Sequence, residues 1–409
     1  MVASKNYGPL AGMKVVELAH IMAGPVCGLM LADMGASVIK VEKIPGGDDT
    51  RRSVPPRVDS ESAAFMMMNR NKRGIALDLK SEDGKEVLRR LLADADVVIE
   101  NYRAGTMERL GFGYESVRKT NPGIVYCSLS GFGRTGPYRD RAGFDLVAQG
   151  MSGLMSITGE GPGRPPVKCG APVTDITAGI LAAMATLAAY THRLKTGEGQ
   201  MVDTSLFEAG IVQTYWQSAI ALATGAAPGP MGSGHPLSAP YQAFATADGW
   251  ITIGAANQGN WLRLVDVLEA GDVGADPRFA DNDARMRHLP DLEAALAPYF
   301  RDRTSADWLA RLENAGVPAG PVFDVGEMHR DPQTLAREMV VEVAHSTLGP
   351  VKTIGLPVKF SGTPGAVTSG APVYGEHTRS VLREHGFSAE DIDRLAATGV
   401  VAAADRITP

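Results

Sequence analysis

The sequence predicts an α/β protein with two domains, a larger one built on a parallel sheet and a smaller α+β domain inserted into it. Short β-branched segments alternate with helical segments over the first half of the chain, which is the pattern of a parallel sheet. A length of 409 residues is too great for one ordinary core. Composition also changes abruptly at residues 224–236, which are rich in glycine and proline, so a domain boundary is expected there.

The first βαβ unit is predicted over residues 13–42. Residues 13–18 form a short β-branched strand, the turn 19–25 leads into a helix, and residues 37–42 form the next strand. The turn 19–25 therefore lies at the carboxyl edge of the sheet, where ligands bind in open α/β folds. It contains no Gly-x-Gly-x-x-Gly motif, so the main support for NAD binding is absent.

Three further strands are predicted at residues 74–79, 96–101 and 124–130, with helices beginning near Ser81 and Met107 between them. The loops that leave the strands are turn-rich, and four of them converge ahead of residue 175: 19–25, 43–52, 102–106 and 131–138. This order predicts a doubly wound, Rossmann-like domain with its site at one edge.

Two basic clusters accompany these strands. Lys43, Arg51 and Arg52 lie in the loop after the second strand, and residues 70–73 read Arg-Asn-Lys-Arg just before the third. Such clusters are usually solvated surface. Two of them beside strands of one sheet would also suit a ligand that carries phosphate groups.

Asp175 stands between a Gly/Pro-rich approach and a run of small apolar residues, 180–188, that has helical character. Because this helix is apolar almost all round, it should be buried. Two interpretations fit the local sequence. Asp175 is a first-turn acid that caps the helix, or it is a catalytic carboxylate held at the helix end and screened from water.

The remaining elements complete the two domains. The apolar helix ends near Gly197, and a strand at 200–205 and a helix at 207–223 follow. The small domain should contain two strands and three helices, at 239–244, 249–253, 261–268, 292–300 and 305–315. The tail, with a strand at 339–343 and two helices after Gly375, is too short to be independent and should rejoin the first domain. We therefore expect a large domain over 1–224 and 326–409 and a small domain with its linkers over 225–325.

Composition and motifs exclude several classes of protein. A net charge of −6 argues against general nucleic-acid binding. The three cysteines have no metal-ligand spacing and are expected to be free thiols. Residues 1–6 show no basic-then-apolar leader, and no uninterrupted apolar run approaches the ~20 residues of a membrane span. We expect a soluble cytoplasmic protein without a membrane partner or a metal.

Histidine is the usual acid or base to look for. His20 has the best position, in the turn after the first strand, and either a ligand contact or a packing role at the helix start fits it. No spacing resembles a zinc site, and no Gly-x-Ser-x-Gly elbow occurs. A metal enzyme or a serine hydrolase is therefore unsupported.

The order of motifs resembles that of the family III CoA-transferases, which include formyl-CoA:oxalate and carnitine CoA-transferases and the related 2-methylacyl-CoA racemases. The resemblance runs almost end to end. The matching segments are 19–25 (AHIMAGP), 35–42 (GASVIKVE), 71–78 (NKRGIALD), 98–103 (VIENYR), 131–133 (GFG), Asp175 with Ala178-Gly179, 195–200 (KTGEGQ) and 375–378 (GEHT).

The resemblance implies a fold and a chemistry. In the family two chains interlock like rings as a homodimer, and the large Rossmann-like domain of each is built from both termini. An aspartate carboxylate attacks the acyl-CoA thioester, forms an anhydride and then an aspartyl-CoA thioester, and passes CoA to an incoming carboxylic acid. The position that matches this nucleophile is Asp175. Coenzyme A is then a substrate, and no tightly bound cofactor is expected.

The resemblance also implies the residues that bind CoA. Lys43 should lie near a phosphate, and Ala142 to Asp145, including Phe144, should face the thioester. Backbone N–H groups there or at Gly232-Ser233-Gly234 would stabilise the oxyanion. The remaining contacts are expected from His20, Met22, Ala23, Leu77 to Lys80, Asn101, Tyr102, Arg103 and Arg109.

Two positions separate the branches of the family. The racemases carry a histidine acid/base group where this chain has Phe144, so transfer is favoured over racemisation. The formyl-CoA:oxalate enzymes have a glutamine where this chain has Met22 and a longer glycine tract, so oxalate is not the expected acceptor. The expected function is transfer of CoA from a donor such as succinyl-CoA or another dicarboxylyl-CoA to a carboxylic acid. The alternatives are a 2-methylacyl-CoA racemase and a CoA-binding protein without turnover.

Overall fold

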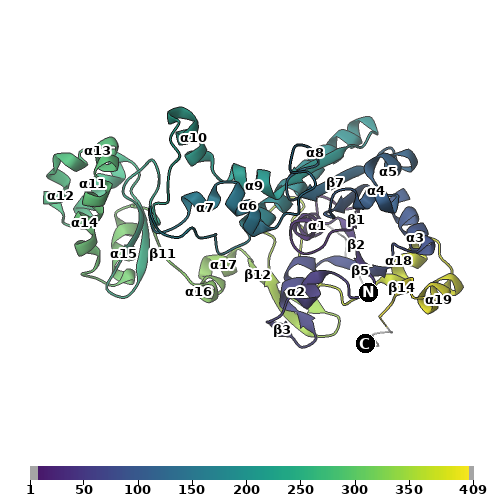
Figure 1. The fold of residues 1–409 in the computed structure, drawn as a ribbon. Coiled ribbons are helices and arrows are strands. Elements are labelled where there is room, and N and C mark those ends of the chain that lie inside the picture. The colour runs from purple at the N-terminus through teal and green to yellow at the C-terminus, as the bar shows by residue number, and fades with distance from the viewer. Residues whose placement is uncertain (1–7, 405–409) are drawn as a thin grey trace. The chain divides into compact units, whose positions relative to one another are not determined.

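The computed structural model describes residues 8–404, and these divide into two compact units (Figure 1). The first unit contains residues 8–152, 170–213 and 332–404, and the second contains Gly153–Cys169 and Thr214–Asp331. The predicted small domain, 225–325, falls within the second unit, which also takes in residues 153–169, 214–224 and 326–331 that had been expected in the large domain. The polar opening at residues 1–6, which was interpreted as no leader, lies outside the described residues.

The first unit is built on a seven-stranded sheet in which six strands are parallel and the short edge strand β14 is antiparallel. The order is β14-β5-β2-β1-β6-β7-β8, so the direction in which strands are added reverses between β1 and β6. In doubly wound sheets, ligands bind at this reversal, beyond the carboxyl ends of the strands. The strands are β1 (Lys14–Glu17), β2 (Ser37–Lys43), β5 (Lys72–Leu77), β6 (Val97–Glu100), β7 (Val125–Ser130), β8 (Met201–Ser205) and β14 (Val401–Ala402).

Helices cover both faces of this sheet, which explains why its strands are apolar on both sides. On one face, Val15 and Val38 belong to a core with α1 (Ala23–Asp33) and α8 (Val173–Thr196). On the other, Val16 and Ile39 belong to a core with α3 (Glu82–Ala93), α5 (Tyr114–Thr120), α18 (Thr378–Glu384) and α19 (Ala389–Ala397). The C-terminal pair α18 and α19, yellow in Figure 1, thus packs in the core of the first unit.

The rest of the first unit consists of short elements at the ends of these layers. They are η1 (Asp49–Arg52), β3 (Arg57–Val58), β4 (Glu61–Ser62), α2 (Ala63–Asn69), α4 (Thr106–Leu110), α6 (Asp145–Met151), α9 (Leu206–Val212), α17 (Pro332–Ala336), β12 (Val340–His345) and β13 (Gly349–Ile354). The strands β12 and β13 form an antiparallel hairpin of their own.

The second unit packs helices against a three-stranded antiparallel sheet of order β11-β10-β9. Its core contains three large aromatic side chains, Trp261, Phe300 and Trp308, all buried. Its elements are α7 (Leu154–Ile157), α10 (Tyr215–Thr224), β9 (Tyr241–Ala245), β10 (Trp250–Gly254), α11 (Gln258–Val267), α12 (Gly271–Ala275), η2 (Pro277–Phe279), α13 (Asn282–Arg287), α14 (Leu289–Phe300), α15 (Ser305–Asn314), β11 (Ala319–Pro321) and α16 (Val325–Arg330).

Several predictions need correction. The small domain has three strands where two were expected, because Ala319–Pro321 forms β11. The single helix expected over 207–223 is two helices, α9 and α10, separated at Gln213 and Thr214, where the chain also passes from the first unit to the second. The basic segment 70–73 is not a ligand-binding surface. Arg70 and Lys72 are buried and pair with Asp33 and Glu17, and Arg73 pairs with Glu384, so these cations hold the fold together.

By length and composition alone, α8 is apolar enough to cross a membrane, with a mean hydropathy of 1.5 over 18 residues. This differs from the expectation that no such run exists. In the structure α8 packs against α1 and the sheet, and Ala178, Ala182 and Ala183 are buried in that contact. A core helix of a soluble protein passes the same test.

Candidate active site

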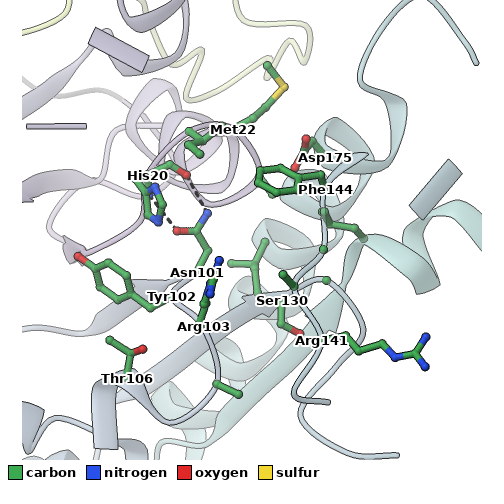
Figure 2. Close-up of a pocket in the computed structure, with 18 of the residues that line it drawn as sticks. His20, Met22, Asn101, Tyr102, Arg103, Thr106, Ser130, Arg141, Phe144 and Asp175 are labelled. Atoms are coloured by element: carbon green, nitrogen blue, oxygen red, sulfur yellow. Dashed lines mark hydrogen bonds between the residues drawn. The ribbon is translucent and has the colours of Figure 1, made fainter. Parts of the chain in front are cut away.

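A pocket of 420 Å³ opens in the first unit at the carboxyl edge of the sheet, beside the reversal between β1 and β6. Its walls come from the loops that leave β1, β6 and β7, together with the first turn of α8 (Figure 2). The predicted convergence of exit loops is therefore present. The residues that line it are His20, Ile21, Met22, Ala23, Asp49, Asn101, Tyr102, Arg103, Ala104, Thr106, Leu129, Ser130, Gly131, Arg139, Asp140, Arg141, Ala142, Gly143, Phe144, Asp175 and Leu206.

Asp175 lies in the first turn of α8, and a close helix contact fixes its position. One turn further along α8, Gly179 packs so tightly against α1 that an added Cβ would lie 2.7 Å from the carbonyl oxygen of Ala23 and from Cβ of Val26. Only glycine permits this approach without a shift of one helix. The contact places Asp175 beside the start of α1, where Met22 and Ala23 also line the pocket.

The carboxylate of Asp175 does not act as a helix cap. Asp145, the first residue of α6, takes that role, because its Oδ1 accepts from the backbone N of Thr174 at 3.0 Å and from its hydroxyl at 2.7 Å. Within residues 8–404, the side-chain carboxylate of Asp175 has no hydrogen-bond donor and no ion-pair partner. Its carboxylate is therefore free to meet a ligand, and the catalytic interpretation of this residue is favoured over the capping one.

The environment raises the pKa of Asp175 to about 6, first because the carboxyl group is largely buried and second because Asp145 is negatively charged nearby. A carboxylate with this pKa is ionised at neutral pH and is more basic than an exposed one. Both properties suit a nucleophile that works at neutral pH.

The turn after β1 is held by Asn101, which follows β6. The side-chain oxygen of Asn101 accepts from the backbone N of His20 at 2.9 Å, and its amide donates to the backbone oxygen of His20 at 2.8 Å (Figure 2). The ring of His20 lies 5.6 Å from that of Tyr102, and burial lowers the pKa of the imidazole. Of the two roles considered for His20, a ligand contact fits its place in the pocket wall.

Phe144 is 63% exposed although it is a large apolar side chain, and it lines the pocket together with Asp175. The loop that carries it is fixed by another close approach. A Cβ on Gly143 would lie 2.4 Å from the Cα of Gly131 in the loop after β7. Two glycines thus let the two ends of the loop between β7 and α6 meet in one wall of the pocket.

The structure brings together most of the predicted site residues and separates a few. Nine of them line the pocket: His20, Met22, Ala23, Asn101, Tyr102, Arg103, Ala142, Phe144 and Asp175. Lys43 borders a smaller cavity of 40 Å³ that His20 and Tyr102 also line. Arg109 donates to the hydroxyl of Thr106, which is itself in the pocket wall.

Like Lys43 and Arg109, three more of the predicted residues are absent from the pocket wall. The side chain of Leu77 belongs to the core beneath the sheet and is 1% exposed, so only its backbone is available to a ligand. Lys80 is exposed after β5. Asp145 lies behind the wall, where it caps α8.

The Gly232-Ser233-Gly234 loop, whose N–H groups were expected to stabilise the oxyanion, belongs to the second unit. The N–H groups of Gly232 and Gly234 donate to the carbonyl oxygens of Gly159 and Met231.

Sequence reasoning missed several residues of the wall, above all Arg139 and Arg141. The signal that could have found them is their place between the glycine-rich loop 131–138 and the motif at 142–145. Together with Arg103 they give the wall three cations. Among the described residues, no group of His, Cys, Asp or Glu has the geometry of a metal site.

The pKa of Asp175 predicts the pH dependence of any reaction that uses its ionised carboxylate. We expect the rate of acylation to rise as the pH passes through about 6, because the protonated acid is a poor nucleophile. Asp145→Asn should move this midpoint to lower pH, since it removes the negative charge nearby but not the burial. Rapid-quench measurement of the first half-reaction between roughly pH 5 and pH 8 tests both expectations. These limits lie roughly one unit below and two units above the pKa of Asp175.

Asp94→Asn is the matched control, because Asp94 pairs with Lys14 on the exposed surface at 2.5 Å and lies outside the pocket wall. A midpoint that is the same in wild type and Asp145→Asn would belong to the substrate or to another group, and would contradict the assignment to Asp175.

Comparisons with known proteins agree with this geometry. A family model described as CoA-transferase family III matches residues 10–378. The chain is 41% identical over 394 residues to the succinate–glutarate CoA-transferase of Agrobacterium fabrum, covering 95% of this chain and 97% of that one. It is 38% identical over 391 residues to the succinyl-CoA:mesaconate CoA-transferase of Haloarcula hispanica, covering 93% and 97%.

Among solved structures, a CAIB/BAIF family protein from Brucella suis matches with a TM-score of 0.83 and 42% identity, covering 93% of this chain and 100% of that chain. The mixed α/β fold with its mainly parallel central sheet is therefore the fold of a solved relative.

Proposed function

The chain belongs to CoA-transferase family III, and from this premise we propose that it transfers CoA between dicarboxylic acids, with Asp175 as the nucleophile. The observation that carries the proposal is the unpaired, largely buried carboxylate of Asp175 in the wall of a pocket at the sheet reversal. We also propose that the large domain is Rossmann-like, because its parallel sheet reverses between β1 and β6, and that CoA lies across the exit loops of β1, β6 and β7.

The reaction proceeds in two matched halves. The Asp175 carboxylate attacks the thioester carbonyl of the donor. The C–S bond breaks, CoA leaves as a thiolate, and a mixed anhydride between Asp175 and the acyl group remains. The thiolate then attacks the aspartyl carbonyl, so that the donor acid leaves as a carboxylate and an aspartyl-CoA thioester remains. The acceptor carboxylate repeats the two steps in reverse order, which regenerates Asp175 and releases the new acyl-CoA. No net proton, oxidant or cofactor is consumed.

The residues of the pocket suit these steps. The first turn of α1 begins at Ala23 in the pocket wall, so the positive end of a helix dipole is available to a developing oxyanion. Arg103, Arg139 and Arg141 supply positive charge for anionic groups of the two substrates. Phe144 adds an apolar surface against which water is excluded from the anhydride.

A dicarboxylate acceptor is favoured by the relatives. The Agrobacterium fabrum protein is named for succinate and glutarate, and the Haloarcula hispanica protein for succinyl-CoA and mesaconate. We infer that succinyl-CoA is the donor and that a short dicarboxylic acid is the acceptor. Racemisation is disfavoured because it needs a second acid/base group opposite Asp175, and the hydrocarbon ring of Phe144 cannot exchange a proton.

A panel of donors and acceptors tests the substrate class. Succinyl-CoA should transfer CoA to glutarate and to other short dicarboxylates with kcat/KM at least about tenfold higher than to monocarboxylates of equal length, because the second carboxylate gains a charged partner. Product acyl-CoA is measured by chromatography and mass spectrometry. Equal rates with monocarboxylates would contradict the dicarboxylate preference, and α-deuteration of a 2-methylacyl-CoA without transfer would favour the racemase.

We further propose that the protein is a cytoplasmic homodimer. Support comes from large apolar side chains that are exposed on three mutually packed helices, α6, α8 and α9: Leu146, Val147, Met151, Ile180, Met184 and Ile211. Isolated monomers rarely expose so many apolar side chains on neighbouring elements. Light scattering at micromolar concentration tests this proposal, and a monomeric mass would overturn it.

A further inference from the structure

The turn 19–25 adopts a backbone conformation that its sequence does not favour. Ile21 has φ +69°, in the left-handed region that a β-branched residue rarely occupies. Ile21 lines the pocket between His20 and Met22, so this conformation sets where all three residues lie. Such strain persists only where surrounding contacts impose it.

Asp48, in the loop after β2, supplies one of these contacts. Its Oδ1 accepts from the backbone N of Ile21 at 3.0 Å, and the same oxygen accepts from the backbone N of Thr50 at 3.0 Å and from its hydroxyl at 2.8 Å. The Asp48 side chain is 1% exposed. It does not line the main pocket, but it borders the smaller cavity of 40 Å³ that Lys43 also lines.

Asp48 is in turn held by Lys40, which projects from β2 and is fully buried. The ammonium of Lys40 lies 2.8 Å from Oδ2 of Asp48 and 3.0 Å from Oε1 of Glu17, and it donates to the backbone oxygen of Ala19 at 2.9 Å. Burial alone would lower the pKa of Lys40, but Glu17 and Asp48 raise it above its ordinary value. Lys40 therefore stays charged, since it pairs with two carboxylates and donates hydrogen bonds to Glu17 and to the backbone oxygen of Ala19.

The other oxygen of Glu17 pairs with Lys72 at 2.8 Å, and Lys72 donates to the backbone oxygen of Pro25 at 2.8 Å. The four side chains Glu17, Lys40, Asp48 and Lys72 thus form a buried cluster with two charges of each sign. Three of its members bond to the backbone of one turn, at Ala19, Ile21 and Pro25. A buried ion cluster is weak support for stability as such, so this concentration on a single turn calls for another explanation.

We propose that this cluster holds the turn 19–25 in its ligand-binding conformation, and that Asp48 is a positioning residue for CoA, acting through the amide of Ile21. The proposal rests on the CoA-binding function proposed above. Asp48 does not touch the reacting atoms, so its loss should weaken binding of the nucleotide substrate far more than it slows the steps at Asp175.

The test compares Asp48→Ala and Asp48→Asn with Asp33→Ala. Asp33 is an equally buried carboxylate, paired with Arg70 at 2.6 Å, but it ends α1 at the opposite end from the turn. Calorimetry gives the Kd of CoA, and steady-state kinetics separates KM for the acyl-CoA donor from kcat. Hydrogen exchange of the peptide that covers residues 19–26 reports the turn directly.

Asp48→Ala should raise Kd and KM about tenfold or more, because the strain at Ile21 is no longer held, while kcat at saturating donor falls less than about threefold. Asp48→Asn should lose less affinity for CoA, since its carbonyl oxygen can still accept from the backbone N of Ile21. If Asp48→Ala does not fold, Asp48→Asn is measured in its place. Exchange at residues 19–26 should accelerate in Asp48→Ala and not in Asp33→Ala.

Unchanged CoA affinity and unchanged exchange in the Asp48 variants would overturn the proposal. An equal loss of affinity in Asp33→Ala would also overturn it, because the effect would then be general destabilisation. A wild-type protein that does not bind CoA would overturn the proposed function instead, and the exchange measurement would still decide whether Asp48 holds the turn.

Discussion

Asp175→Ala is expected to abolish CoA transfer, with kcat reduced by at least about 10⁴-fold, because no other carboxylate in the pocket wall stands in the first turn of α8. CoA binding should persist, since the exit loops that we assign to the nucleotide do not depend on this side chain. Asp175→Asn should be equally inactive, because an amide of the same shape is not a nucleophile. Transfer rates by chromatography and the Kd of CoA by calorimetry check both expectations.

The same substitutions should not destabilise the fold. The pKa of Asp175 in the folded protein, about 6, lies above its ordinary value of 3.8. Such a group contributes stability in acid that is lost as the pH rises through about 6, so the ionised carboxylate opposes folding at neutral pH. Asp175→Asn removes this cost, and its unfolding temperature at pH 8, about two units above the pKa, should equal or exceed that of the wild type. A folded, CoA-binding Asp175→Asn variant with wild-type turnover would refute the assignment of the nucleophile.

Gly179→Ala is expected to have the second largest effect. Its Cβ would lie 2.7 Å from both Ala23 and Val26, closer than such atoms approach, so α8 must move away from α1. Asp175, one turn earlier on α8, would move with it. We expect kcat to fall about 10²-fold, since a shift of about 1 Å at a reacting group has effects of this size. Overpacking should also lower the free energy of unfolding by about 1–3 kcal/mol.

Gly170→Ala is the matched control for this substitution. Gly170 precedes Asp175 by five residues in the same unit, and nothing lies within 4 Å of where its Cβ would be. Its kcat should stay within about twofold of the wild-type value, and its free energy of unfolding within about 0.5 kcal/mol. A Gly179→Ala variant with the kcat of Gly170→Ala would show that the close contact between α1 and α8 does not position Asp175.

The elements that frame the site could be predicted from sequence because their signals are local. The strands β1, β2, β6 and β7 are apolar runs bounded by turn residues, and parallel strands bring their exit loops to one edge of the sheet. The prominence of Asp175 followed from an acid placed at the start of an apolar helix. Its identification as a nucleophile needed the family resemblance, since the local pattern fits a cap equally well.

The features that were missed depend on contacts between residues far apart in the chain. Lys72 belongs to a basic cluster of the kind that is usually solvated surface, and only the folded sheet brings Glu17 between it and Lys40. Asp145 was expected to face the thioester. It instead belongs to α6, an earlier helix in the chain, and accepts a hydrogen bond from the first turn of α8. The break between α9 and α10 has no glycine or proline to mark it, because Gln213 and Thr214 are ordinary residues at a change of unit.

Mass spectrometry of the enzyme after incubation with succinyl-CoA is the most direct test of Asp175 as the nucleophile. We expect a CoA thioester on the peptide that contains Asp175, sensitive to hydroxylamine, formed before acceptor is added and discharged when glutarate is supplied. The Asp175→Asn variant should show no adduct. Turnover of succinyl-CoA and glutarate without any adduct or hydroxylamine-sensitive acyl group at that peptide would contradict the account.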